Sequence, residues 1–258
     1  IKGSLIDAET EELLKEIQPG SIILFKRNIK SYEQVKKLIS ELKELLLTPP
    51  LIAIDQEGGQ VVRFVNDITV FPGNMALGAA GSEELSFKQG LYSAWELKKI
   101  GIDINLSPVV DVVTTYHNPS IKTRSFGSNH IKVAKLGTAY IQGMQMMKVA
   151  AVAKHFPGIG AAKVNVHYDL PLLPISEQTF KDIHFLPFKK AIKTGVKGIM
   201  STHIYCPFID KGEKKPATFS SKIVKQYLRE KFNFNGVIFS DDLEMGAIDR
   251  YYSINDAC

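Results

Sequence analysis

Short apolar runs alternate with longer amphipathic segments along the whole chain. Six of the apolar runs have the length of a β-strand, and most of them follow a Gly or Pro that interrupts the preceding segment. The run 149–153 is continuously apolar, which is typical of a strand buried on both faces. The predicted strands are residues 22–25, 51–55, 103–111, 149–154, 198–203 and 236–241.

The segments between these runs carry apolar residues at helical spacing. In one of them four apolar residues fall on a single helix face, namely Val35, Leu38, Ile39 and Leu42. Strands that alternate with such helices predict βαβ units and a parallel sheet. Ser220 or Ser221 is a suitable N-cap for the last helix. The predicted helices are residues 11–17, 32–45, 83–100, 131–147, 187–194 and 221–232.

We interpret residues 1–258 as a single α/β domain, because no linker or change of composition divides the chain. A closed (β/α)8 barrel of the TIM type and an open doubly wound sheet both fit the pattern. The glycines form no G-x-G-x-x-G fingerprint, and charged residues follow nearly every strand, as they do at the mouth of a barrel. The barrel is therefore favoured. Six visible strands instead of eight predict that its first and last strands are absent from this chain.

The composition of the chain limits the kinds of partner that it is expected to bind. The net charge of +5 comes mostly from scattered lysines, without a basic block interleaved with aromatic residues, so we expect no nucleic-acid partner. No apolar run is long enough to span a bilayer, so no membrane partner is expected. Cys206 and Cys258 form neither a metal-binding spacing nor a disulfide framework, and reduced thiols fit a cytoplasmic protein. The oligomeric state is left open.

Three predicted strands end in residues that carry chemistry. One strand ends at Lys154 and His155, before a Phe-Pro-Gly loop, and another ends at Asp241 and Asp242. The third ends at Asp55, which Gln, Glu and two glycines follow. Because the carboxyl ends of parallel barrel strands meet at one face, these groups are expected to lie together.

Asp241 and His167 are the candidate catalytic residues. Asp241 ends its strand, where a carboxylate could attack an acetal carbon or bind a metal, whereas Asp242 suits a cap of the following helix. His167 lies in the loop after the Lys154 strand, and an imidazole can donate and accept protons near neutral pH. Asn165, two residues earlier, could orient that ring by accepting its N–H. A surface histidine is the alternative.

The remaining candidates suit the binding of a polar ligand. The carboxylate of Asp55 could accept two sugar hydroxyls, and Arg63 could share its loop or form a salt bridge. Arg124 could anchor an anion or an amide carbonyl, and a pair with a surface carboxylate is equally compatible with its position. His203 follows another strand and means little by itself.

The order of these motifs resembles glycoside hydrolase family 3, in particular its β-N-acetylglucosaminidase branch. The loop Lys-His-Phe-Pro-Gly with a downstream His distinguishes this branch from the β-glucosidases of the family. The matching stretches span nearly the whole chain: residues 24–28, 55–59 with Arg63, 71–78, 107–111, 124–127, 154–158, 216–220 and 240–243.

The resemblance implies a TIM barrel and retaining hydrolysis of terminal β-linked N-acetylglucosamine, without a metal or other cofactor. Asp241 matches the nucleophile of the family and His167 matches the acid/base of this branch. The resemblance also implies cytoplasmic action on small glycosides from cell-wall muropeptides. The sugar-binding candidates are Asp55, Arg63, Arg124, Lys154 and His155.

Two positions depart from the branch. Ile159 stands where a second His is usual, and Asn165 stands where an Asp pairs with the catalytic His. A neutral amide cannot stabilise an imidazolium, and the analogous change in a Ser-His-Asp triad costs about 10⁴ in kcat. Two further hypotheses therefore stay open. One is a sugar-binding protein of the same fold with weak or no turnover, and the other is a family hydrolase for another β-glycoside.

Overall fold

The computed structural model describes residues 1–115, 119–163, 168–211 and 214–257. In this part of the chain six strands form one parallel sheet, and their order in the sheet is their order in the sequence. All six runs predicted as strands contribute to it. The strands are β1 (Ser21–Leu24), β2 (Leu51–Ile54), β3 (Ile104–Asn105), β4 (Ala150–Phe156), β5 (Gly198–Ser201) and β6 (Val237–Ser240).

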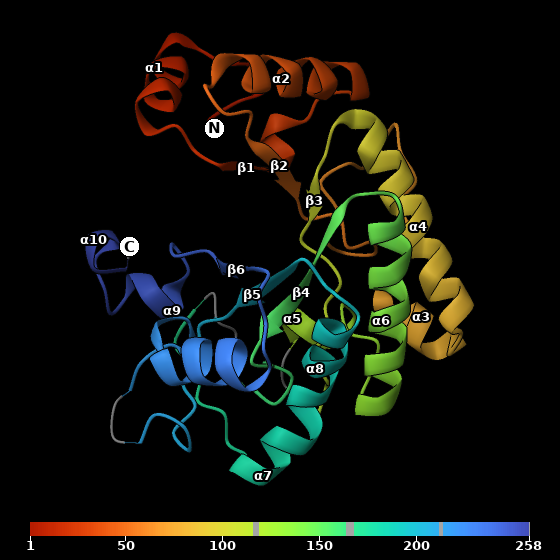
Figure 1. Cartoon of the computed structure of the whole chain (residues 1–258), viewed down its shortest axis with the longest axis vertical. Coiled ribbons are helices and arrows are strands. Elements are labelled where there is room, and N and C mark those ends of the chain that lie inside the picture. Colours follow the sequence, from red (N-terminus) through yellow and green to blue (C-terminus); the bar gives the residue numbers. More distant parts are fainter. Residues whose placement is uncertain (116–118, 164–167, 212–213, 258) are drawn as a thin grey trace.

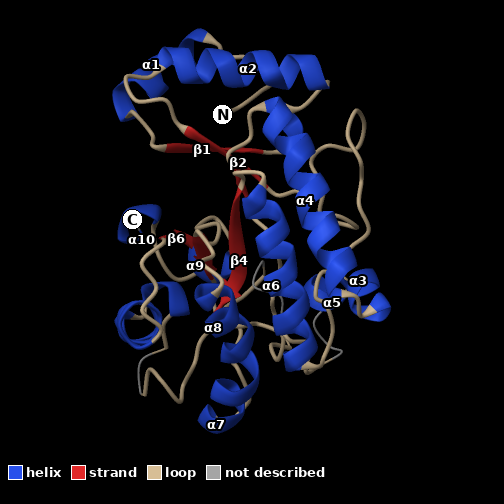
Figure 2. Cartoon of the chain, turned by 45° about the vertical axis from the view of Figure 1, so that its right-hand side comes forward, coloured by secondary structure: helices blue, strands red, loops and turns tan. Residues whose placement is uncertain are grey.

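The long helices follow one another around the outer side of this curved sheet (Figure 1), and the strands run through the middle of the molecule (Figure 2). Their order along the chain is α1 (Ala8–Ile17), α2 (Tyr32–Leu45), α4 (Glu83–Ile100), α6 (His130–Met146), α8 (Phe185–Lys193) and the π-helix η4 (Lys222–Lys231). A doubly wound sheet would reverse its strand order at a switch point. The sequential order therefore shows a half-barrel, and closure into eight strands stays a prediction.

Shorter helices connect these elements, and the sequence pattern did not predict them. Most have only one or two turns, too few residues for a helical period to stand out. They are η1 (Lys26–Asn28), α3 (Asn74–Ala80), α5 (Pro119–Lys122), α7 (Glu177–Thr179), the π-helix η2 (Phe180–His184), η3 (Ala217–Phe219), α9 (Gly246–Asp249) and α10 (Ile254–Ala257).

Side-chain caps set several helix starts. The hydroxyl oxygen of Ser31 accepts the backbone N–H of Gln34 at 3.2 Å, and the side chain of Asn129 accepts two N–H groups at the start of α6. For η4, Ser220 rather than Ser221 supplies the cap, because its hydroxyl oxygen accepts the N–H of Ile223 at 3.2 Å. Each of these bonds satisfies a helix-terminal N–H that has no partner within its helix.

The third strand is much shorter than its predicted span of 103–111. Only Ile104 and Asn105 belong to β3, and the chain rejoins β4 through an isolated bridge between Val109 and Lys154. Pro108 lies between these two contacts and has no N–H to donate to a ladder. The segment is nevertheless buried, so the apolar pattern reflected burial correctly and strand length incorrectly.

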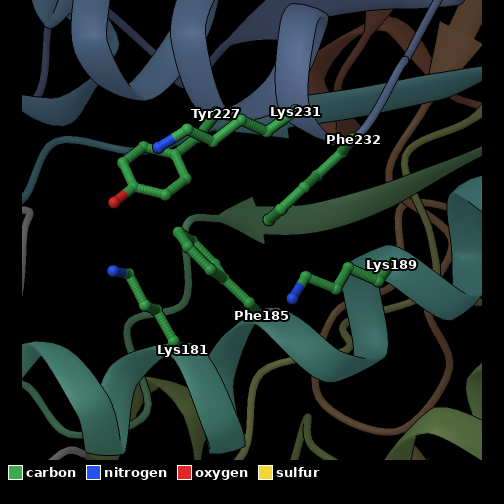
Figure 3. A pocket seen from close by; sticks show the side chains of 6 residues that line it. All are labelled: Lys181, Phe185, Lys189, Tyr227, Lys231 and Phe232. Atoms are coloured by element: carbon green, nitrogen blue, oxygen red, sulfur yellow. The ribbon is translucent and has the colours of Figure 1, made fainter.

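An aromatic cluster lies between α8 and η4, on the outer side of the sheet. The Phe185 ring lies 5.2 Å from that of Tyr227 and 4.9 Å from that of Phe232, measured between centroids. Lysine ammoniums lie against these rings (Figure 3), with Lys231 4.1 Å from the centre of Tyr227 and Lys189 5.1 Å from that of Phe232. Both ammoniums are thus close enough to a ring face for a cation–π interaction.

Helices α4 and α6 approach each other unusually closely. Gly90 of α4 lies against the backbone of Tyr140, and Gly143 of α6 lies against the backbone of Phe87. A side chain at either glycine would occupy the position of the facing backbone. The hydroxyl of Ser86 adds a hydrogen bond of 2.8 Å across the same interface, to the carbonyl oxygen of Leu136.

Replacement of Gly90 by Ala should therefore destabilise the protein, because the added Cβ collides with the carbonyl oxygen of Tyr140. Overpacking of this kind costs about 1 to 3 kcal/mol, and we expect a lower midpoint of urea unfolding for Gly90→Ala. Gly20→Ala is the matched control, since nothing lies within 4 Å of a Cβ added there. Equal midpoints for the two variants would contradict the close approach of the helices.

Candidate active site

A cavity of about 740 Å³ opens at the carboxyl ends of the strands. Six of the eight residues predicted for the site line it: Asp55, Arg63, Arg124, Lys154, His155 and Asp241. They come from segments up to 186 positions apart, and the parallel sheet brings them to one face. The other two predicted residues, Asn165 and His167, lie outside the described residues.

One wall of the cavity is formed by Asp55, Arg63, Arg124, Lys154 and His155, and a buried ammonium lies at its centre. The Nζ atom of Lys154, at the end of β4, lies 2.7 Å from Oδ1 of Asp55 and 2.7 Å from Oε1 of Glu57. The Lys154 side chain is only 3% exposed. Both carboxylates follow β2, and β3 separates β2 from β4 in the sheet. One cation therefore ties together two strands that are not neighbours.

Two arginines extend the network. Arg63 donates from Nη2 to Oδ2 of Asp55 at 2.9 Å, so the predicted salt bridge between the two is present. Arg124 forms a bidentate ion pair with Glu57, in which Nε lies 2.9 Å from Oε2 and Nη2 lies 2.7 Å from Oε1. This fork geometry fixes the guanidinium plane as well as its charge.

The network changes the acidity of its members. Burial alone would raise the pKa of the Asp55 carboxyl, but Lys154 and Arg63 beside it lower that pKa to about 2. Burial opposes ionisation of Glu57 in the same way, and Lys154 and Arg124 lower its pKa to about 2. Burial would lower the pKa of Lys154, yet the two carboxylates raise it above its usual range. All of these groups are therefore charged at neutral pH.

His155 is held by a second buried carboxylate. Its Nδ1 lies 2.7 Å from Oδ2 of Asp111, and its Nε2 lies 3.3 Å from Nη2 of Arg124. Arg124 can only donate, so Nε2 accepts and Nδ1 carries the proton that is donated to Asp111. Asp111 also accepts the backbone N–H groups of His155 at 3.1 Å and Ile159 at 2.8 Å. One carboxylate thus orients both the imidazole and the loop that follows β4.

Asp241 stands directly after β6. Its backbone N–H donates to the carbonyl oxygen of Ser201 at 2.9 Å, which extends the pairing with β5 by one residue. The side chain is largely buried, with Oδ1 accepting the N–H of Asp242 at 3.0 Å and Oδ2 3.4 Å from the hydroxyl of Thr202. Among the described residues no cation forms an ion pair with it. Its negative charge therefore remains available at the cavity.

The residues around Asp241 have structural tasks. His203 is buried, and its Nε2 lies 3.0 Å from the carbonyl oxygen of Asp242, so that nitrogen is the donor while Nδ1 accepts from Thr218 at 2.9 Å. Burial lowers the pKa of His203, which keeps this ring neutral. The carboxylate of Asp242 accepts the N–H of Glu244 at 2.9 Å. This bond closes a turn ahead of α9, whose N-cap is Met245 and has no side-chain cap, so the prediction that Asp242 caps the following helix is wrong.

Sequence reasoning missed Glu57 and Asp111 as members of the site. Both lie in the stretches that match the family, but neither was assigned a role, although Asp111 ends the predicted strand 103–111 and Glu57 follows the strand 51–55. Glu57 is 2% exposed and Asp111 is 1% exposed, so each acts through the side chains that it holds. A buried carboxylate needs a partner, and the signal that could have identified both was the excess of cations among the candidates.

Over the described ranges no three His, Cys, Asp or Glu side chains are grouped so that they could hold a metal ion. No helix in those ranges has the length and apolar character needed to cross a membrane. Cys206 is a buried free thiol whose pKa burial raises, and Cys258 lies outside the described residues.

The sequence matches the family described as Glycosyl hydrolase family 3 N terminal domain over residues 3–258. Two curated relatives are named beta-hexosaminidase. The protein from Nitrosomonas eutropha is 38% identical over 263 residues, which covers 98% of this chain and 74% of the relative. The protein from Nitrosospira multiformis is 35% identical over 255 residues, covering 95% of this chain and 71% of the relative.

Solved structures agree with these matches. A glycoside hydrolase family 3 beta-N-acetylglucosaminidase from Paenibacillus sp. str. FPU-7 superposes with a TM-score of 0.96 at 39% identity, covering 99% of this chain and 49% of that one. NagZ from Neisseria gonorrhoeae in complex with N-trifluoroacetyl-D-glucosamine gives 0.89 at 34% identity, covering 97% and 75%. The chain thus spans about half of the Paenibacillus protein.

The depressed pKa values predict acid sensitivity. A carboxylate whose folded-state pKa is lowered stabilises the fold above its unfolded pKa, near 4, and loses this effect as the pH falls through the folded value, about 2 for Asp55 and Glu57. Each shift corresponds to a stabilisation on the order of 2 to 3 kcal/mol. We expect the free energy of unfolding, measured with urea, to fall steeply between about pH 5 and pH 2.

Glu57→Gln isolates this contribution. The variant should be less stable at pH 7 by about 3 to 5 kcal/mol, because Lys154 and Arg124 lose a buried partner, and its stability should change less between pH 5 and 2. Glu41→Gln is the control, since Glu41 pairs with Lys37 on the surface at 3.6 Å. Parallel pH profiles for wild type and Glu57→Gln would exclude this source of acid sensitivity.

Proposed function

The chain belongs to glycosyl hydrolase family 3 and is a glycoside hydrolase; from this premise we propose that it removes terminal β-linked N-acetylglucosamine with retention of configuration. The observation that carries the proposal is the cavity in which Asp241, whose carboxylate forms no ion pair among the described residues, lies with a preorganised set of hydrogen-bonding groups. The names of the relatives, beta-hexosaminidase and beta-N-acetylglucosaminidase, support this choice of sugar.

The proposed reaction has two steps. In the first, Asp241 attacks the anomeric carbon, the bond to the leaving oxygen breaks, and His167 gives that oxygen its proton. In the second, His167 takes a proton from water, and the oxygen of that water displaces Asp241 from the anomeric carbon. Two inversions give overall retention. Asn165 is proposed to orient the imidazole ring of His167. The absence of an ion pair on Asp241 among the described residues supports its role as nucleophile, since a paired carboxylate would be a weaker one.

Asp55, Arg63, Arg124, Lys154 and His155 are proposed to hold the sugar. Their mutual ion pairs and hydrogen bonds fix these side chains before the substrate arrives, so that binding costs little conformational entropy. The Lys154 ammonium donates two of its N–H groups to carboxylates, and its third N–H can donate to a hydroxyl of the sugar. The carboxylate of Asp55 has lone pairs beyond the two that Lys154 and Arg63 engage. A neutral, hydroxyl-rich ligand is the class that this wall suits.

We further infer that the substrates are small glycosides derived from cell-wall fragments and that hydrolysis takes place in the cytoplasm. A second function, sugar binding with little turnover, is favoured by one observation. Ile159, at the position where this branch usually has His, lines the cavity with an apolar side chain, and its backbone N–H donates to Asp111. Residue 159 therefore offers no group that could exchange a proton with a ligand.

The nucleophile assignment predicts that Asp241→Asn abolishes turnover of p-nitrophenyl β-N-acetylglucosaminide. The amide is isosteric but cannot form the covalent intermediate, so we expect a loss of at least about 10³ in kcat. Asp242→Asn, which keeps an oxygen for the N–H of Glu244, should stay within a few-fold of wild type. Similar rates for wild type and Asp241→Asn would rule out Asp241 as the nucleophile.

Because residue 165 carries a neutral amide, a variant with a carboxylate at this position is predicted to be more active than the wild type. A carboxylate beside His167 would stabilise the imidazolium, so Asn165→Asp should raise kcat on the same substrate by about 10-fold or more. Asn165→Ala should not produce this gain. If wild type and Asn165→Asp both bind N-acetylglucosamine in calorimetry and neither turns over the glycoside, the protein is a sugar binder and the hydrolase proposal fails.

A further inference from the structure

The cavity contains a cation that no carboxylate of the described residues balances. The other arginine and lysine side chains of the wall all form ion pairs within it. Arg27 also lines the cavity, but its contacts in the described chain are of another kind. Its Nε donates to the carbonyl oxygen of Ile1 at 3.3 Å, and its guanidinium carbon lies 4.8 Å from the centre of the Phe25 ring. This positive charge is available to a ligand.

The backbone around Arg27 is fixed. Asn28 is fully buried, its Oδ1 accepts the N–H of Phe25 at 2.9 Å, and its Nδ2 donates to the carbonyl oxygens of Ile1 and Gly3 at 3.1 and 2.7 Å. These hydrogen bonds fix the backbone conformation of the short helix η1, which follows β1. The contact with Phe25 further limits the rotamers of the long Arg27 side chain. An arginine held in this way loses less entropy on binding than a free surface lysine.

Arg27 lies next to the proposed sugar site, at its outer edge. The guanidinium of Arg63 lies 5.4 Å from the same Phe25 ring, and Arg63 in turn pairs with Asp55. A path of contacts thus runs from Arg27 over Phe25 to the sugar-binding wall. Since β1 is an edge strand of the sheet and the sugar-binding carboxylates follow β2, Arg27 belongs to the rim of the cavity. A group attached to the sugar would reach it.

We propose that Arg27, with Phe25 as an apolar platform, recognises a carboxylate on the aglycone, so that the preferred substrates are β-N-acetylglucosaminides with a singly charged anionic aglycone. This inference rests on the proposed function of the cavity, because it assumes that the sugar binds on the wall described above. The two terminal nitrogens of the guanidinium match the two oxygens of a carboxylate. The ring edge of an aglycone can lie against Phe25.

The charges on the other side of the cavity favour a carboxylate over a phosphate dianion. Asp242 and Glu244 line the cavity beyond β6, the opposite edge strand, and both are exposed. One guanidinium balances one negative charge. A second negative charge on the ligand would have no partner and would be repelled by these carboxylates.

The test compares two substrates that differ only in charge. The aglycones are 4-carboxyphenol and its carboxamide, 4-carbamoylphenol, each β-linked to N-acetylglucosamine, and release of the free sugar gives kcat/KM. Wild type should prefer the carboxylate by about 3- to 10-fold at low salt, and the preference should shrink at high salt. In Arg27→Gln the ratio should fall to about 1. Lys26→Gln removes a neighbouring exposed charge that does not line the cavity and should keep the wild-type ratio.

Binding measurements separate this inference from the proposed function. The same two glycosides are titrated by calorimetry into Asp241→Asn and into the double variant Arg27→Gln, Asp241→Asn. A preference of at least 3-fold for the carboxylate that disappears with Arg27 supports the inference, even if wild type shows no turnover and the hydrolase proposal fails. A wild-type ratio near 1, or a ratio that survives Arg27→Gln with an unchanged melting temperature, overturns it.

Discussion

The ammonium of Lys154, buried between the carboxylates of Asp55 and Glu57, is the interaction on which the cavity depends. Removal of three charges from water is costly, and a buried ion network of this kind adds little net stability compared with an apolar core. Its value is geometric. The three groups join the ends of β2 and β4 across the intervening β3, and no apolar contact could set donor and acceptor positions so closely.

A series of hydrogen bonds connects this centre to the other side chains of the wall and fixes their orientations. Glu57 holds Arg124, Arg124 donates to His155, and His155 is locked by Asp111, which also receives the N–H of Ile159. Each group thus fixes the tautomer or the plane of the next. The chain of contacts leads from the buried ammonium to the loop that precedes residues 164–167. A disturbance at Glu57 would therefore be felt at His155, although the two side chains share no contact.

The sequence predicted the part of this arrangement that follows from period and topology. The βα alternation identified all six strands, and the rule that parallel strand ends converge brought six of eight candidate residues into one cavity. Glu57 and Asp111 were missed because nothing in a sequence distinguishes a carboxylate that holds another side chain from any other acidic residue. The length of β3 was overestimated because burial, and not hydrogen bonding, produced the apolar run around Pro108.

The distribution of charge separates two kinds of recognition. In the middle of the wall three cations share the carboxylates of Asp55 and Glu57, and the carboxylate of Asp111 beside His155 makes the numbers equal, so that the surface offered there is polar but nearly neutral. Such a surface binds a neutral sugar through hydrogen bonds and does not attract ions indiscriminately. Within the described chain, the charges that line the cavity without an ion pair lie at its two edges: Arg27 after β1, and Asp241, Asp242 and Glu244 after β6. In the proposed mechanism a negative charge at Asp241 would stabilise the positive charge that develops at the anomeric carbon, and an ion pair with a wall cation would weaken this effect. The proposed role of Asp241 as nucleophile therefore requires that the charges of the wall neutralise one another.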